Sequence, residues 1–288
     1  MPPKKIPTKN TWWKLCDLSA KDLTVKVWHG INDDDVWGRS AQLAYYFFFA
    51  LFPLAICLTA VLGVIVGSTS RTAQNLIDYL TRAMPPSAVT IVHQTMHTAL
   101  SASGGGKITF GILLALFFAS SGLSALMDTL NVVFGVRERR SLLRQRVIAL
   151  LLTLIVGGLI CLAVLLVVVG DHIAGTLGVG ALKLVWRILE YPGAVLFLLF
   201  AYSLIYYYAP DLRHRQRRWL TLGSIVGVAL WILASFGLRV YLHFFNSYTV
   251  TYGTLGAVMT LLLWFYVTGF SILVGGEINA IIDKTRDP

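Results

Sequence analysis

Between two long apolar runs lies the basic stretch VRERRSLLRQR, residues 136–146. Five of its eleven residues are arginine, and each flanking run is longer than the about 20 residues that a helix needs to cross a bilayer. Four further runs of similar length and composition occur along the chain. The six runs cover residues 41–67, 108–133, 147–170, 189–209, 220–243 and 253–282. We therefore predict an all-α integral membrane protein with six transmembrane helices.

The overall composition agrees with this fold class. Of the 288 residues, 56% are hydrophobic and only 13% are charged, which is more apolar than is usual for a soluble protein of this length. A buried helix of a soluble domain would explain one such run, but not six in series. The net charge of +10 does not require a nucleic-acid partner, because basic loops also bind anionic lipid headgroups.

Lysine and arginine are concentrated in alternate segments between the apolar runs. Eighteen of the 24 lie before the first run, in the linkers 134–146 and 210–219, and in the C-terminal tail; six lie in the remaining segments. Basic residues are retained on the cytoplasmic side of the membrane during insertion. Both ends of the chain are therefore predicted to lie in the cytoplasm.

The chain divides into a cytoplasmic arm (1–35), a six-span membrane domain (36–282) and a short cytoplasmic tail (283–288). Within the arm, tryptophan and leucine side chains alternate with lysines over residues 11–31, which predicts an amphipathic helix lying in the membrane interface. The polar stretch 32–35 should end this helix, and one of its short side chains should cap the next one.

Two further features concern the first span and the segment that follows it. Pro53 falls inside the first apolar run and predicts a kink, because proline removes an intrahelical hydrogen bond. The first external segment, 68–107, contains two amphipathic stretches separated by Pro85 and Pro86. These stretches predict short helices resting on the outer leaflet.

Polar side chains gather at the cytoplasmic ends of predicted spans one, two and six. Ionisable groups are costly within a bilayer, so each calls for a partner or a function. Two interpretations are open: a gate in which Glu277 or Asp128 binds a cation, a proton or a headgroup, or a hydrogen-bond network, with Arg39 paired to Glu277, that fixes helix packing. The residues of this predicted cytoplasmic mouth are Arg39, Gln42, Asp128, Asn131, Glu277 and Asn279.

A second polar pair lies near the external end of the fifth span. Arg239 and His243 are one helical turn apart, so both side chains project in one direction. This pair is a candidate for attracting an anionic ligand. Contact with lipid headgroups explains the same arrangement.

Enzyme and metal-binding motifs are absent from the sequence. It contains no HExxH, GxSxG or P-loop, and no GxGxxG that follows a strand. The three cysteines lack CxxC spacing, and the His93–His97 pair has no carboxylate nearby. We expect no enzyme activity, no cofactor and no metal. Gly223 and Gly227 form a GxxxG, which fits packing within one bundle as well as dimerisation, so the oligomeric state stays open.

Several short motifs, taken in their order and spacing, resemble the YihY/virulence factor BrkB family, which is also labelled ribonuclease BN-like and includes UPF-type inner-membrane proteins. The resemblance covers about residues 25–282. The motifs are AQLAYY (41–46), LFP (51–53), Ala125-Leu126 with Leu130-Asn131, Tyr206 with Pro210, YGTLGA (252–257), LWFY (263–266) and GGEIN (275–279).

The resemblance implies a six-span protein of the bacterial inner membrane with a role in the cell envelope. From it and from the polar mouth we expect a transporter-like protein that moves lipid or another amphipathic or anionic substrate. Since the sequence has no ATP-binding motif, transport would be passive or driven by an ion gradient. The alternative is an envelope-integrity scaffold that transports nothing. A membrane ribonuclease is disfavoured, because no cluster of histidines and carboxylates is suited to holding two metal ions.

Overall fold

A computed structural model describes residues 19–50, 105–176, 180–212, 221–244 and 254–286. These residues form helices joined by short loops, and no strand occurs among them. One helix occupies residues 36–50. The others are α1 (Ala20–Asp33), α5 (Gly105–Val133), α6 (Leu142–Thr176), α7 (Gly180–Tyr208), α8 (Leu222–Phe244) and α10 (Thr254–Arg286). The prediction of an all-helical protein is confirmed for the described part of the chain.

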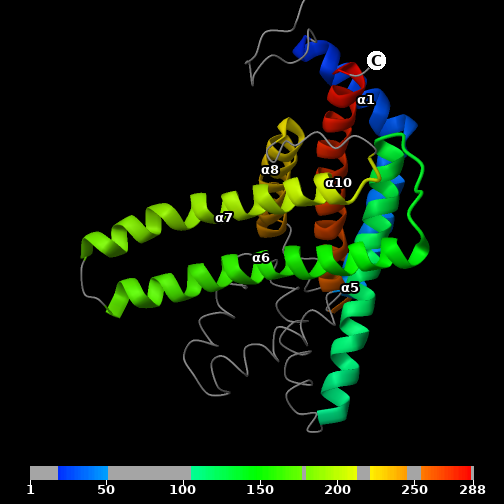
Figure 1. Ribbon diagram of the computed structural model, residues 1–288. Coiled ribbons are helices and arrows are strands. Elements are labelled where there is room, and N and C mark those ends of the chain that lie inside the picture. Colours follow the sequence, from blue (N-terminus) through cyan, green and yellow to red (C-terminus); the bar gives the residue numbers. More distant parts are fainter. Residues whose placement is uncertain (1–18, 51–104, 177–179, 213–220, 245–253, 287–288) are drawn as a thin grey trace, which may run out of the picture.

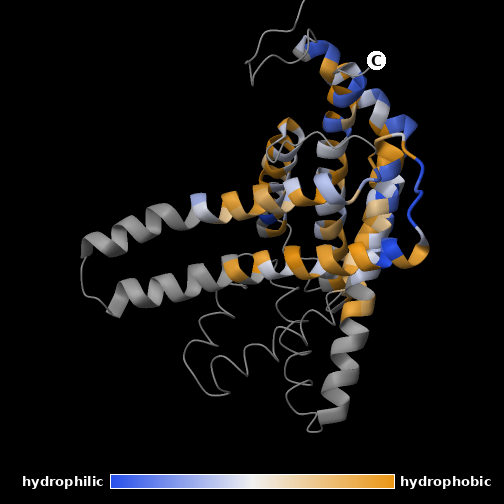
Figure 2. Cartoon of the chain, viewed as in Figure 1, coloured by the Kyte–Doolittle hydropathy of each residue, from blue (hydrophilic) through white to orange (hydrophobic). Residues whose placement is uncertain are grey.

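Among the described residues, helices lie along each of the six apolar runs, the first of which is described only over residues 41–50. Three of the described helices contain segments long and apolar enough to cross a membrane: Leu142–Ile160, Leu222–Leu242 and Val258–Thr285. The stretch Pro192–Tyr208 of α7 is a shorter apolar helix. Figure 2 shows orange, apolar residues along the coloured parts of α6 and α7, and orange mixed with white on α8 and α10. Six complete spans and their orientation stay a prediction, and the kink at Pro53 and the helices expected up to residue 104 lie outside the described residues.

The helices run in two main directions (Figure 1). In this view α5, α8 and α10 run roughly along one axis, whereas α6 and α7 lie side by side and cross that axis. α8 packs against α10, and α6 packs against both α5 and α7. The short linker between α5 and α6 therefore joins two crossing helices.

Helix α10 lies at the centre of the described core. Leu273 and Ile272 of α10 are buried in the same apolar cluster as Leu126 and Leu130 of α5. Tyr206 of α7 reaches into this core, where its hydroxyl donates to the carbonyl of Ile272 at 2.7 Å. A hydroxyl buried among apolar groups needs such a partner, so this bond fixes α7 against α10.

Helix α1 covers the C-terminal half of α10. Its Leu23, Val27 and Ile31 are spaced four residues apart, so they form one apolar stripe that packs into the core. Trp28 lies outside this stripe and is 58% exposed. Helix α1 thus packs one apolar face against the protein and leaves Trp28 on the outside, while its position in the membrane interface stays a prediction.

The acidic stretch after α1 forms a tight turn into the next helix. Asp35 adopts a positive φ of 49°, and its Oδ1 accepts a hydrogen bond from the backbone N–H of Gly38 at 3.2 Å. Aspartate tolerates this left-handed conformation better than most residues, and its short carboxylate satisfies a free N–H at a helix start. The expectation that one of residues 32–35 caps the following helix is confirmed.

Candidate functional site

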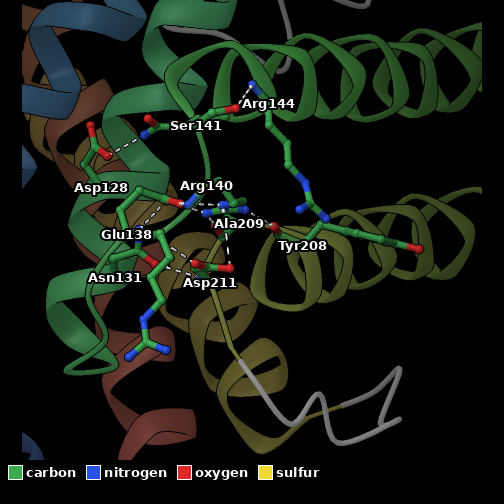
Figure 3. Close-up of polar contacts among 11 residues, drawn as sticks. Asp128, Asn131, Glu138, Arg140, Ser141, Arg144, Tyr208, Ala209 and Asp211 are labelled. Atoms are coloured by element: carbon green, nitrogen blue, oxygen red, sulfur yellow. Dashed lines mark hydrogen bonds and ion pairs between the residues drawn. The ribbon is translucent and has the colours of Figure 1, made fainter.

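Four side chains join the linker after α5 to the chain that follows α7. We call this group the linker clamp, and Figure 3 shows it. Arg140 is at its centre, with a side chain only 4% exposed. The members are Asn131, Glu138, Arg140 and Asp211.

Arg140 binds one carboxylate and one helix end at the same time. Its Nη2 lies 2.6 Å from Oε2 of Glu138, and its Nε donates to Oε1 of Glu138 at 2.7 Å. The guanidinium also donates to the backbone carbonyls of Tyr208 at 3.3 Å and Ala209 at 2.8 Å. These carbonyls end α7, where the helix dipole is negative, so a cation is favoured there. The Arg140 guanidinium holds the pKa of Glu138 below its ordinary value.

Asn131, predicted as a mouth residue, completes the clamp. Its Nδ2 donates to Oε2 of Glu138 at 2.8 Å, and its Oδ1 accepts from the backbone N–H of Asp211 at 2.8 Å. Asp211 in turn accepts from the backbone N–H of Arg139 at 3.1 Å. Asn131 thus connects the end of α5 to segments seven and 80 residues away in sequence. In the described structure, both Nδ2 and Oδ1 of Asn131 therefore form hydrogen bonds that hold these segments together.

Asp128 joins α5 to α6. It is exposed, and its Oδ1 accepts from Nε2 of Gln145 at 2.6 Å. One residue further along α6, Arg146 donates to the hydroxyl of Ser121 at 2.9 Å and lies 4.5 Å from the centre of the Phe117 ring. These contacts attach the start of α6 to the side of α5, and they fix the point where the two helices cross.

Asn279 attaches α10 to the start of α8. Its Oδ1 accepts from the backbone N–H of Gly223 at 3.0 Å, and its Nδ2 donates to Oγ1 of Thr221 at 3.0 Å. The first N–H groups of a helix have no partner within the helix, so Asn279 supplies one from outside. Its contacts are those of a helix cap.

The two mouth residues of the first span are placed near the turn after α1. Arg39 donates from Nε to the backbone carbonyl of Asp34 at 2.8 Å, and Gln42 is exposed on the helix over residues 36–50. The expected Arg39–Glu277 ion pair is not among the ion pairs of the described residues. The Arg39 side chain therefore stabilises the turn by donating to the backbone carbonyl of Asp34.

Glu277 differs from the other mouth residues. It is 2% exposed, and its Oε1 is a buried polar atom with no hydrogen-bond partner among the described residues. Its other oxygen faces Gly30 of α1: a Cβ at that position would lie 2.6 Å from Oε2. The carboxyl of Asp34 is within hydrogen-bonding reach, and Lys284 is the nearby positive charge. A buried carboxylate without a full set of partners is costly, so this position calls for an explanation.

Asp34 was not among the residues predicted for the mouth. Its run of three aspartates indicated a helix cap, and the cap is in fact Asp35. Asp34 and Glu277 are far apart in sequence, and only the packing of α1 against α10 brings their carboxyls together. The feature of the sequence that could have indicated this contact is Gly30, because a residue without a side chain leaves room for Glu277 beside α1.

The external pair is not part of this site. Arg239 is exposed on α8, toward the end opposite Gly223, and the side chain of His243 lies outside the described residues. Within the part of the chain that the structure describes, no three histidine, cysteine or carboxylate side chains are grouped to hold a metal ion. The described polar residues therefore divide into joints between helices and the Asp34–Glu277 pair.

Comparison with known proteins gives consistent matches. The sequence profile of the family described as "Virulence factor BrkB" matches residues 27–288. The ribonuclease-like protein YfkH of Bacillus subtilis strain 168 is 33% identical over 253 residues, which are 86% of this chain and 90% of the relative. The UPF0761 membrane protein Smlt0865 of Stenotrophomonas maltophilia is 26% identical over 291 residues, covering 98% of this chain and 66% of the relative.

A UPF0761 membrane protein of Xanthomonas campestris pv. campestris, xcc-b100_3490, is 28% identical over 267 residues. The match covers 90% of this chain but 60% of that protein. The chain thus spans most of the Bacillus relative and two thirds or less of these UPF0761 relatives. No solved structure matches the chain.

Proposed function

The chain belongs to the virulence factor BrkB family of bacterial membrane proteins, and from this membership and the buried Glu277 we propose that it is a transporter-like protein of the inner membrane. The substrate we propose is a lipid or another amphipathic or anionic molecule of the envelope. Six spans with both chain ends in the cytoplasm are part of this proposal. No enzyme activity is part of this proposal, and the ribonuclease-like name is that of the Bacillus relative.

The observation that carries the proposal is the state of Glu277. Asn131, Asn279 and Asp128 each have hydrogen-bond partners that give them a structural role. Glu277 is buried in an apolar helix with one oxygen unpartnered. An ionisable residue in such a place is expensive to keep, and in membrane proteins it commonly marks a path for an ion or a substrate.

The lipid as substrate is supported by the surface around the site. The first turn of α6 exposes Leu142 and Leu143 to 85% and 77%. Exposed Arg139 and Arg144 stand beside these leucines. An apolar surface next to guanidinium groups suits a molecule with acyl chains and an anionic headgroup.

A scaffold without transport is the second candidate. The linker clamp and the Asn279 cap favour it, because they show that most polar residues of the mouth hold helices together. A scaffold needs these joints and has no use for an unpartnered carboxylate. The two candidates therefore differ in what the loss of the Glu277 charge does.

The test is lipid translocation in proteoliposomes made with the purified full chain. Fluorescent phospholipids are quenched from one side, and wild type is compared with Glu277→Gln, with Asp22→Asn and with empty vesicles. Asp22 is an exposed carboxylate on α1, so its variant matches the charge change away from the site. We expect wild type and Asp22→Asn to make inner-leaflet lipid accessible and Glu277→Gln to fall to the empty-vesicle level. Wild type equal to empty vesicles for zwitterionic and anionic headgroups would contradict a lipid substrate.

A further inference from the structure

We infer that the carboxyls of Asp34 and Glu277 form a binding site for one proton, held between α1 and α10. This inference adds to the proposed function. It rests on that function only for the role of the bound proton, because a transporter driven by an ion gradient needs a place where the ion binds. The binding itself is a property of these two carboxyls and their surroundings.

The first argument is the burial of Glu277. Its Oε1 has no hydrogen-bond donor among the described residues, and its side chain is 2% exposed. A bare carboxylate in this position would lose its hydration without gaining a partner. A proton on the pair supplies the missing donor, because a protonated carboxyl donates one hydrogen bond and its neighbour accepts it.

The second argument is that backbone contacts hold Asp34 in place. Its N–H donates to the carbonyl of Gly30 at 2.9 Å, and its own carbonyl accepts from Nε of Arg39 at 2.8 Å. These two bonds fix the backbone of Asp34 in the turn at the end of α1, and its side chain is half-buried there. Gly30 stands against Oε2 of Glu277, and a Cβ at this position would lie 2.6 Å from that oxygen, so a larger residue would displace the glutamate side chain.

The third argument is the balance of charge around the pair. Asp33 adds a further negative charge from α1, and Lys284 of α10 is the positive group that acts on Glu277. Arg39 binds the backbone carbonyl of Asp34, and it takes part in neither ion pair found among the described residues. Two carboxyls within hydrogen-bonding reach repel one another when both are ionised, and one shared proton removes the repulsion.

A proton fits the site better than a metal ion. The pair offers two carboxyls, and no third histidine, cysteine or carboxylate ligand is grouped with them among the described residues. A metal ion needs more ligands than this, whereas a proton needs two oxygens in line. Sodium is the competing monovalent ion, and the experiment includes it.

The location of the site gives the proton a mechanical effect. Asp34 lies in the turn between α1 and the helix over residues 36–50, and Glu277 lies on α10. Loss of the proton leaves two negative charges facing each other across the α1–α10 contact. The repulsion acts on the turn that leads directly into the predicted first span, so proton release loosens this junction and proton binding closes it.

The test reads the proton directly and needs no transport assay. Infrared difference spectra of the full chain in lipid nanodiscs are recorded during a pH titration, in water and in heavy water. We expect wild type at neutral pH to show the C=O stretching band of a protonated carboxyl, with the isotope shift that such a group has. Glu277→Gln and Asp34→Asn should each lose the band, and Asp22→Asn should keep it.

Three results would overturn the assignment: no such band in wild type at neutral pH, a band that persists undiminished in Glu277→Gln, or a wild-type band that sodium chloride removes and potassium chloride does not. Gly30→Ala is the second line of evidence if either amide variant misfolds. It keeps both carboxyls but displaces Glu277, so the band should shift or weaken. Because lipid movement is not measured, a failed translocation assay leaves this result standing, and the reverse is also true.

Discussion

Arg140 is a charged residue that the fold buries almost completely. This burial is possible because the planar guanidinium donates hydrogen bonds to the Glu138 carboxylate and to two backbone carbonyls at the end of α7. Lysine has no such fork and would reach only one of these partners well. The arginines of the linker thus have a second role besides orienting the chain in the membrane. Arg140 joins the linker after α5 to the end of α7.

The ion pair at Glu138 makes a prediction for the dependence of stability on pH. Arg140 lowers the pKa of Glu138 in the folded protein below its ordinary value of 4.5. The stabilisation is therefore fully present above about pH 4.5 and is lost as the pH falls through the lowered folded-state pKa. Thermal unfolding of wild type and Glu138→Gln, measured between pH 7 and pH 3, should show an advantage of wild type at neutral pH that shrinks on acidification.

The matched control for this titration is Asp22→Asn, which removes an exposed carboxylate of α1. It should follow the wild-type curve at all pH values. A constant difference between wild type and Glu138→Gln down to pH 3 would contradict the role of the Glu138 charge. It would mean that the glutamate contributes by shape alone.

At the scale of elements, α8 and α10 approach more closely than any side chain would allow. A Cβ on Gly223 would collide with the backbone carbonyl of Gly275, and it would also lie 2.5 Å from the amide of Asn279. Gly237, further along the same helix, has open space around it. The same residue type thus has two different roles on one helix: close backbone contact at its start and ordinary exposure near its end.

This contrast gives a prediction for two alanine variants. Gly223→Ala should lower the free energy of unfolding by about 2 kcal/mol or more, because the backbone carbonyl it meets cannot move aside as a side chain would. Gly237→Ala should be neutral or stabilising by up to about 1 kcal/mol, since alanine favours the helix. Thermal unfolding of the purified protein in one detergent measures both. Equal effects of the two substitutions would contradict the close α8–α10 contact.

At the scale of the whole molecule, the linker clamp ties together both ends of the α6–α7 hairpin. α6 begins after the linker at residue 142, α7 ends at residue 208, and Arg140 bonds to the carbonyls there. The start of α6 and the end of α7 must therefore lie on the same side of the membrane. This holds whether the two helices cross the bilayer or run across the other helices as in Figure 1.

Labelling of single cysteines tests this arrangement. In a background with Cys16, Cys57 and Cys161 replaced, Arg137→Cys, Leu212→Cys and Lys284→Cys should all react with an impermeant maleimide only from the cytoplasmic side. Opposite sides for residues 137 and 212 would contradict the clamp as well as the topology. Gly180→Cys, at the far end of the hairpin, should react from the external side if the six-span prediction holds.

The existence and class of the helices could be predicted from the sequence, and so could their approximate limits. The contacts at the site could not. Asn131 lies in the last turn of α5 and Asn279 lies within α10, yet nothing local showed that one holds a loop and the other caps α8. The polar stretch 32–35 predicts a cap without indicating which residue supplies it, because the choice depends on the turn geometry at Asp35.

That the chain is a helical membrane protein resembling this family could be predicted from the amino-acid sequence, because apolar content, charge alternation and short motifs are all local properties of the chain. Only the tertiary structure decided that α6 and α7 run across the other helices, that Arg140 closes the linker clamp, and that Asp34 faces Glu277. The physical reason is that transmembrane helices are apolar on nearly every side, so hydropathy does not say which face meets which neighbour. Those choices depend on glycines that permit close contact and on a few polar groups that need partners.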